Sequence, residues 1–444
     1  MIHPSTRSTI DVRRAGSGHA GMLVVVALLI LLANGSSLAR GQGFAPAHTS
    51  TAAAVEQAHS ELQRRFIDRF GIVHDYVGEL PTPEDCRLGR PNAIGWWSPI
   101  ENGPMFTGLY LPAACERARR SGAAADRDFA RSLAQGLLKC ASVSDVPGFI
   151  ARGVGSDGTC HYPLGSDDQT HPWFLGLHAY VKSDIPTADE RTAVVKKMTE
   201  VAAVLESTGW RCPCDGAFRG EFRGGYRGHL FRDAVRYLYL LRAMHDVTGD
   251  AVWLERYRRA AAEKPHGSDQ TRGEICAVGY PQDREAIKYL DESQLWIYVG
   301  SQASLAKLIA LETDDTLKAR YRAGLAVNVE QARRAIAGSK AFDNRDTKVF
   351  GNADWRAVYS TWFPQPTQAE AARLAEIADK AKRGERKHYE TRWMRNPLAA
   401  CAISAHSDDA ATRAEIETAL RHYDYAKLYM AELFFAECAY YTLP

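Results

Sequence analysis

The sequence predicts an all-α fold, specifically an (α/α)6-type toroid of helical hairpins with room for one extra closing pair. Three observations lead to this prediction. From about residue 50 onward, runs rich in Ala, Leu, Arg and Glu place apolar residues three and four positions apart, the period of an amphipathic helix. Strand-like alternation is scarce. The expected helices also alternate between two kinds, which differ in polarity and in the loop that precedes them.

The first kind of helix follows a long polar loop with aromatic residues and is the more apolar kind. Its starts are expected near Pro104, Thr170, His229, Asp291, Ala353 and Arg395. The second kind follows a short turn and is more charged, as expected for an outer helix. Its starts are expected near Asp126, Thr187, Asp250, Asp314, Thr367 and Asp408. At one of them, Thr187 followed by Glu190 has the spacing of a capping box.

Starts of the first kind recur roughly every 60 residues, which indicates a repeat of architecture rather than of sequence. Hairpins with an apolar inner helix and a polar outer helix bury their apolar faces by packing side by side, and six of them close into a ring. The first helix, over 52–68, and the final run, over 425–441, are candidates for the extra closing pair. An open helical solenoid is the alternative, although solenoid repeats are usually shorter and more regular.

The amino terminus resembles an export signal. Arg13 and Arg14 precede an apolar run over 22–33, and small residues follow it at 37–39. We therefore expect a signal peptide over 1–39, a disordered lead-in over 40–50 and a single toroid domain over 51–444. An uncleaved membrane anchor is the alternative, but the run is shorter than the ~20 residues of a membrane span. Both interpretations place the body of the protein outside the cytoplasm, either in the periplasm or extracellular.

Charge and cysteine content exclude several classes of function. The 444-residue chain has a formal net charge of +2, and removing residues 1–39 brings it closer to neutrality. This balance argues against a nucleic-acid or membrane-surface binder. The nine cysteines all follow residue 80, and we expect them to be structural. No spacing indicates a metal site or a nucleotide cofactor, so neither is expected, and no pattern indicates an oligomeric state.

The loops before first-kind helices contain the candidate catalytic residues. In the ring these loops reach one face, so Glu101 and Asp168, each at the start of a neighbouring inner helix, are expected to face each other. Glycosidic hydrolysis needs such a pair, one carboxyl to protonate the leaving oxygen and one to activate water or attack carbon. Asp168 is preferred over Asp167 because it lies nearer the expected helix start. The alternative role for each acid is helix capping.

The same loops contain side chains suited to holding a sugar. Tryptophan offers a flat apolar face to a pyranose ring, and arginine forks bind carboxylates. The predicted substrate-binding residues are Asn102, Asp167, Gln169, His171, Trp173, Arg227, Arg232, Glu292, Trp296 and Trp355. The rival mechanism is β-elimination, in which Tyr226 or His229 removes the proton next to a uronate carboxylate. We therefore include Tyr226 and His229 among the catalytic candidates.

The alternating hairpins, the Trp-rich loops and the elements over 101–103 and 167–170 resemble the six-hairpin glycosidase superfamily. Unsaturated glucuronyl hydrolases and the toroid domains of heparinase- and alginate-lyase-type enzymes share that architecture. The resemblance covers about residues 90 to 440, and it implies a secreted glycoside hydrolase acting on an acidic, uronate-containing glycan. A polysaccharide lyase is the first alternative, and a non-catalytic secreted glycan- or protein-binding module is the second. Fold analogy does not decide among the three.

Overall fold

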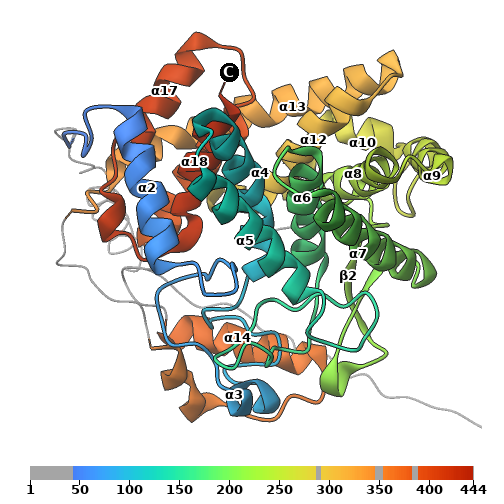
Figure 1. Ribbon diagram of the computed structural model, residues 1–444, viewed down its shortest axis with the longest axis vertical. Helices are drawn as coiled ribbons and strands as arrows, with labels where there is room; N and C mark the ends of the chain where they lie inside the picture. The colour runs from blue at the N-terminus through green and yellow to red at the C-terminus, as the bar shows by residue number, and fades with distance from the viewer. Residues whose placement is uncertain (1–43, 287–291, 346–353, 383–388, 444) are drawn as a thin grey trace, which may run out of the picture. The chain divides into compact units, whose positions relative to one another are not determined.

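The computed structural model describes residues 44–286, 292–345, 354–382 and 389–443. These residues are mostly helical, which confirms the all-α class (Figure 1). The exception is a small antiparallel pair of strands, β1 (Arg211–Pro213) and β2 (Phe222–Gly225). Within this part of the chain, no helix is both long and apolar enough to cross a membrane. The predicted signal peptide and residues 40–43 lie outside the described residues.

Five of the first-kind helices form close to their predicted positions. They are α4 (Gly103–Ser121), α6 (Asp167–Lys182), α8 (Phe231–Thr248), α12 (Val299–Leu311) and α16 (Asn396–Ser404). Each packs against the next in chain order. The terminal helix α18 (Phe435–Thr442) then packs against both α16 and α4. These helices are apolar on several sides because each contacts two like neighbours and an outer helix.

The second-kind helices lie outside these contacts and are amphipathic. They are α5 (Ala124–Cys140), α7 (Ala188–Ser207), α9 (Ala251–Ala262), α13 (Asp315–Ile336) and α17 (Ala410–Leu420). The short helix α10 (Arg272–Val278), which was not predicted, packs on α8 and α13. Helix α5 packs on α4 and α6, α7 on α6 and α8, and α13 on α12 and α16. The amino-terminal helix α2 (Thr51–Arg65) packs on α17 and α18. The predicted capping box at Thr187 and Glu190 is present, so local sequence determined where α7 begins.

The prediction of a first-kind helix near Ala353 is wrong. Ala353 lies outside the described residues, and the chain after it forms only the 3-10 segment η4 (Trp355–Thr361) before α14 (Gln368–Lys382). Trp355 donates its indole N–H to the Glu79 carbonyl oxygen at 2.9 Å, and Arg356 pairs with Asp85 at 3.2 Å. This segment is therefore bound to the chain before α4 and to α3 (Pro83–Leu88), and it does not enter the main core.

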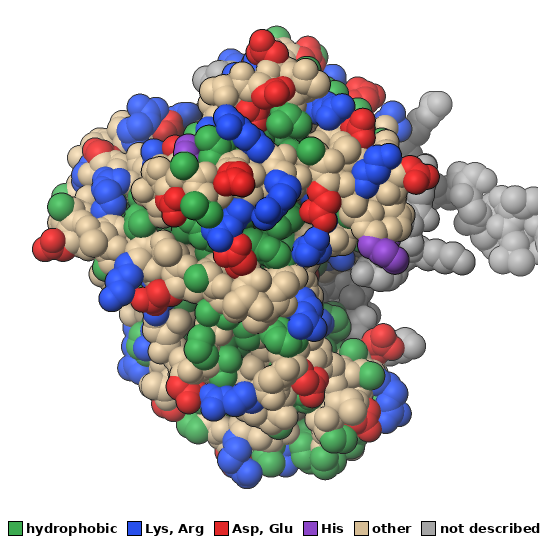
Figure 2. Space-filling view, turned by 90° about the vertical axis from the view of Figure 1, so that its right-hand side faces the viewer, with side chains coloured by type: hydrophobic (Ala, Val, Ile, Leu, Met, Phe, Trp, Pro, Cys, Tyr) green, Lys and Arg blue, Asp and Glu red, His purple; other side chains and the backbone are tan. Residues whose placement is uncertain are grey.

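The remaining elements are short. They are η1 (Gly216–Phe218), α11 (Pro281–Ala286), η2 (Glu292–Tyr298), η3 (Ala337–Ala341), the π-helical η5 (Thr391–Arg395), η6 (Tyr425–Lys427) and η7 (Ala431–Phe434). On the face of the molecule shown in Figure 2, acidic and basic side chains are intermingled, as expected for a chain with almost no net charge.

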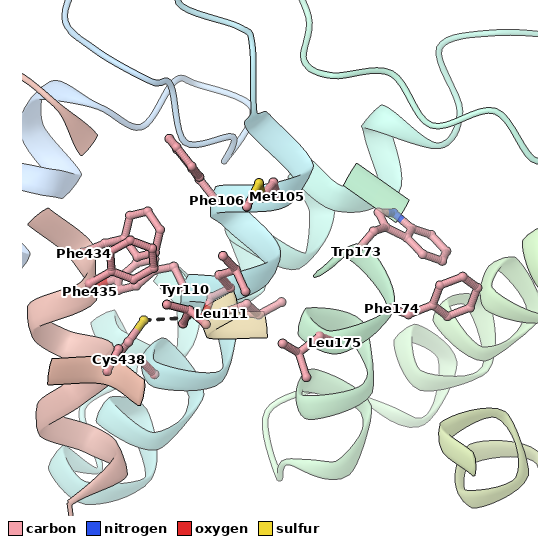
Figure 3. Packing of buried hydrophobic residues seen from close by; sticks show 14 of the residues in the cluster. Met105, Phe106, Tyr110, Leu111, Trp173, Phe174, Leu175, Phe434, Phe435 and Cys438 are labelled. Atoms are coloured by element: carbon pink, nitrogen blue, oxygen red, sulfur yellow. Dashed lines mark hydrogen bonds between the residues drawn. The ribbon is translucent and has the colours of Figure 1, made fainter. Parts of the chain in front are cut away.

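Helices α4 and α6 approach each other more closely than side chains would permit. A Cβ atom added to Gly108 would lie 2.0 Å from the Pro172 carbonyl oxygen, and one added to Gly176 would lie 2.8 Å from the Gly108 Cα atom. The two backbones are therefore in contact. Beside this crossing, the rings of Phe106 and Phe434 pack 5.4 Å apart and form part of an aromatic layer in the core (Figure 3).

Cys86 in α3 belongs to a small buried cluster, and Cys160 packs against the same cluster. Both are free thiols in the structure. We predict that oxidised glutathione converts this pair to a disulfide, with two thiols oxidised and glutathione reduced. Closing so long a loop should stabilise the fold by about 4 kcal/mol. The measurements are peptide mapping by mass spectrometry and guanidinium unfolding with and without reductant. Cys86→Ser should abolish the difference, whereas Cys140→Ser, which alters a buried cysteine elsewhere, should retain it.

Candidate functional site

The candidate site is built where the loops before α4 and α6 meet, and the buried side chain of Arg152 joins them. Arg152 donates to the Glu101 carbonyl oxygen at 3.0 Å and to the Ser166 Oγ atom at 3.2 Å. Burial and the nearby Arg223 lower its pKa to about 10, while the charges of Glu101, Asp168 and Asp75 act in the opposite direction. Arg152 thus connects the loops before α4 and α6, and the charges of Glu101 and Asp168 both act on its guanidinium group.

Asp167 and Asp168 form the first turn of α6, and both bind Arg236 of α8. One Arg236 nitrogen lies 2.8 Å from a carboxylate oxygen of each acid. The Asp168 side chain is 41% exposed, whereas that of Asp167 is 14% exposed. Gly224 of β2 covers Asp167 so closely that a Cβ atom there would overlap its carboxylate. Asp168 is thus the acid of this pair that a ligand can reach.

The pKa values of Asp167 and Asp168 are shifted in opposite directions. Burial opposes ionisation of both, but Arg236 and Arg232 outweigh it at Asp168 and lower the pKa of that carboxyl. Burial and the neighbouring Asp168 charge raise the pKa of Asp167. Asp168 is therefore ionised throughout the physiological pH range, which suits a base or a nucleophile and excludes a general acid.

Asn102 and Gln169 connect the two loops below the exposed acids. The Gln169 side-chain N–H donates to the Asn102 Oδ1 atom at 3.0 Å, and Gln169 accepts from the Met105 backbone N–H. Asn102 in turn donates twice to Asp75, from its backbone at 2.8 Å and from its side chain at 2.6 Å. Both residues were predicted to bind substrate. They are buried and hold the loops in place instead.

Asp75 is a buried carboxyl that no sequence pattern indicated. Burial, followed by the charge of Glu101, raises its pKa well above the ordinary value, although the hydrogen bonds from Asn102 favour the charged form. The Glu101 carboxylate itself accepts the Trp97 backbone N–H at 2.9 Å. Asp75 and Trp97 thus fix the loop around Glu101, and this support is formed by residues distant in sequence.

Arg232 and Trp296 lie at the same end of the inner helices. The Nε atom of Arg232 is buried without a hydrogen-bond partner, and its charge acts on both Asp167 and Asp168. Trp296 is half-buried, and the guanidinium carbon of Arg395 lies 4.6 Å from its ring centroid. Both residues thus lie at the end of the inner helices where Asp168 lies, and their binding of substrate stays a prediction.

Tyr226, His229 and Arg227 do not form the group that was predicted. Tyr226 has no exposed surface, and burial raises the pKa of its phenol well above the ordinary value. His229 is exposed beside Gly267, and Arg227 pairs with Glu263 at 2.7 Å on the outside of the molecule. A phenol that is buried and protonated at neutral pH is a poor base, so Tyr226 and the exposed His229 do not form the predicted catalytic pair.

Three further predictions of substrate contact are corrected. His171 is fully buried, with its Nε2 atom 2.9 Å from the Ser304 Oγ atom, and burial lowers its pKa well below the ordinary value. Trp173 is fully buried and donates to the Leu137 carbonyl oxygen. Trp355 is covered by its contact with Glu79. The side chain of Glu292 lies outside the described residues, as does Asp291.

Among the residues that the structure describes, no cluster of three or more His, Cys, Asp or Glu side chains is arranged to hold a metal ion. A comparison with known proteins found no match to a family model, to a curated protein or to a solved structure. The functional assignment therefore depends on the geometry of the site.

Proposed function

We propose that the chain is an exported (α/α)6 toroid that hydrolyses glycosidic bonds in an acidic, uronate-containing glycan. The toroid is supported by the order of helix contacts, in which α18 packs between α16 and α4 and so returns the series to its beginning. In this arrangement α2 and α18 form the sixth hairpin rather than an extra pair. An experimental structure in which α18 leaves α4 would contradict the ring.

The observation that supports hydrolysis best is the exposed, ionised Asp168, whose charge acts on the buried Arg152 together with that of Glu101. Asp168 would activate water or attack the anomeric carbon, because its lowered pKa keeps it charged. Glu101 would then protonate the leaving oxygen. Arg236 donates to the Asp168 carboxylate at 2.8 Å, and the Asn102–Gln169 contact keeps the two loops together.

The acidic character of the substrate is proposed from Arg232. Its buried Nε atom has no hydrogen-bond partner, although it lies 3.7 Å from an Asp233 carboxylate oxygen, and the charges of Asp167 and Asp168 also act on the guanidinium group. A uronate carboxylate could accept hydrogen bonds from its terminal nitrogens, since arginine binds carboxylates through paired donors. Trp296 at the same end would contribute an apolar face to the sugar ring.

The experiment is to incubate the purified protein with uronate-containing oligosaccharides and to separate the products. New reducing ends without absorbance near about 235 nm support hydrolysis, because elimination creates an unsaturated uronate that absorbs there. Absorbance at that wavelength would establish the lyase alternative. Binding without any cleavage, measured by calorimetry on the same oligosaccharides, would establish the non-catalytic binding module.

A further inference from the structure

A cavity of about 600 Å³ lies at the carboxyl-terminal parts of the inner helices, whereas the candidate site lies at their amino ends. Helices α4, α6 and α12 provide most of its wall, and the ends of α16 and α18 complete it. Its volume is within the range of small-molecule sites, which are typically about 300–1,000 Å³.

The wall of this cavity consists mainly of small apolar side chains. Alanines line it from four helices, and larger apolar residues contribute edges; the alanines are Ala113, Ala179, Ala303, Ala306, Ala310 and Ala402. Because a methyl group fills so little space, the close-packed helices leave an opening here that Leu or Phe would close. An apolar ligand body would recover the contacts that the opening lacks.

The charged side chains at the mouth are mostly paired. Arg119 binds Glu116 at 2.6 Å, Asp184 binds Arg127 at 2.7 Å, and Lys182 binds Asp246 at 3.2 Å. Lys307 of α12 differs, since it has no ion pair or hydrogen bond with any residue that the structure describes. The same holds for the imidazole of His406, which follows α16.

Lys307 and His406 together have the chemistry of a carboxylate site. Burial and the charge of Lys307 lower the pKa of His406 to about 4, so His406 is neutral at pH 7 and can still donate one N–H. The two acids of the lining, Glu116 and Asp184, are each paired with an arginine. An anion bound at this mouth therefore depends on the Lys307 ammonium group for its stabilisation.

We propose that this cavity binds a small amphipathic carboxylic acid, with its apolar body against the alanine wall and its carboxylate at Lys307 and His406. A cationic ligand would be repelled by Lys307, which is exposed, and a purely apolar one would gain nothing from Lys307 or His406. The proposal stands independently of the glycosidase activity, because it uses the opposite ends of the helices and no residue of the candidate site.

The test is isothermal calorimetry with octanoate, using octanol as the uncharged chain of the same length. We expect octanoate to bind more tightly than octanol. Lys307→Met, which keeps the length of the side chain but removes its charge, should weaken octanoate about tenfold and leave octanol unchanged. Lys196→Met, at an exposed lysine of α7, is the matched control and should change neither affinity. Ala303→Phe should abolish binding of both ligands by filling the cavity.

Equal affinities for octanoate and octanol, or unchanged octanoate binding by Lys307→Met, would overturn the carboxylate assignment. Full binding by Ala303→Phe would overturn the location, and no octanoate binding up to its solubility limit would overturn the proposal as a whole. Circular dichroism verifies that Ala303→Phe is folded. If it is not folded, Ala306→Leu places a smaller side chain in the same cavity. This variant should also abolish binding, and full binding by it would contradict the location.

Discussion

Asp168→Asn is expected to lower kcat on a uronate oligosaccharide by about 10³-fold, within the range attributed to a positioned acid or base. The amide cannot act as a base or nucleophile, yet its oxygen can still accept the hydrogen bond from Arg236. The fold should therefore persist, which circular dichroism can verify, and KM should change much less than kcat. Steady-state kinetics on the purified variant measure both parameters.

The matched control is Asp128→Asn, which alters an exposed acid in the first turns of α5 and should leave kcat unchanged. Glu101→Gln tests the partner. The decrease in kcat caused by Glu101→Gln should be smaller on an aryl glycoside with an acidic leaving group than on the oligosaccharide, because that group departs without protonation. Full activity of Asp168→Asn would refute the assignment of this residue, whatever the substrate.

Arg236→Met is expected to destabilise the fold by about 3–5 kcal/mol at pH 7 because it leaves two carboxylates without their shared cation. Arg236 is 2% exposed and donates to both Asp167 and Asp168, so water cannot easily replace it. Urea unfolding at pH 7 measures the loss. Arg334→Met, at an exposed ion pair with Glu330, is the control and should cost less than about 1 kcal/mol.

The same variant should gain more stability from mild acid than the parent protein, in which only Asp167 has a raised pKa. In the parent protein, Arg236 and Arg232 lower the pKa of Asp168 below its unfolded value, so this carboxyl stabilises the fold above the unfolded pKa, and the contribution fades as pH falls through the lowered pKa. Without Arg236, burial should raise the pKa of both carboxyls above the unfolded value. Protonation of each carboxyl would then stabilise the fold. The deficit of Arg236→Met should therefore shrink between pH 7 and pH 5, and a constant deficit would contradict this account.

Helix positions were predictable wherever the amphipathic period and a local cap agreed. Thr187 with Glu190 and Asp250 both begin helices as predicted, because capping depends on residues within one turn. Thr367 has a similar signal and precedes α14, but the hairpin expected around it does not form. The segment η4, which was expected to form the first helix of that hairpin, is bound to Glu79 and Asp85 instead. Contacts between residues so far apart in sequence cannot be predicted from the local spacing of apolar residues.

The candidate site was predictable at the ends of helices and not within them. Glu101 and Asp168 could be placed from sequence because they lie at the beginning of the neighbouring helices α4 and α6. His171 and Trp173 were misplaced because α6 begins at Asp167 rather than near Thr170, so both lie beyond the first turn and face the core. Arg152 and Asp75 are in loops without any periodic pattern, and only the folded chain brings them to Glu101.

The backbone contact between Gly108 and Gly176 has a consequence for how this protein can diverge. Where two main chains touch, the distance between the helices cannot shrink, and it grows only if a side chain is added at the crossing. The two glycines therefore set the distance between α4 and α6, and with it the distance between the loops that precede these helices. Descendants of this chain should acquire new substrates by exchanging loop residues and should retain both glycines, so a variant library restricted to the loops should yield more active proteins than one that includes the crossing.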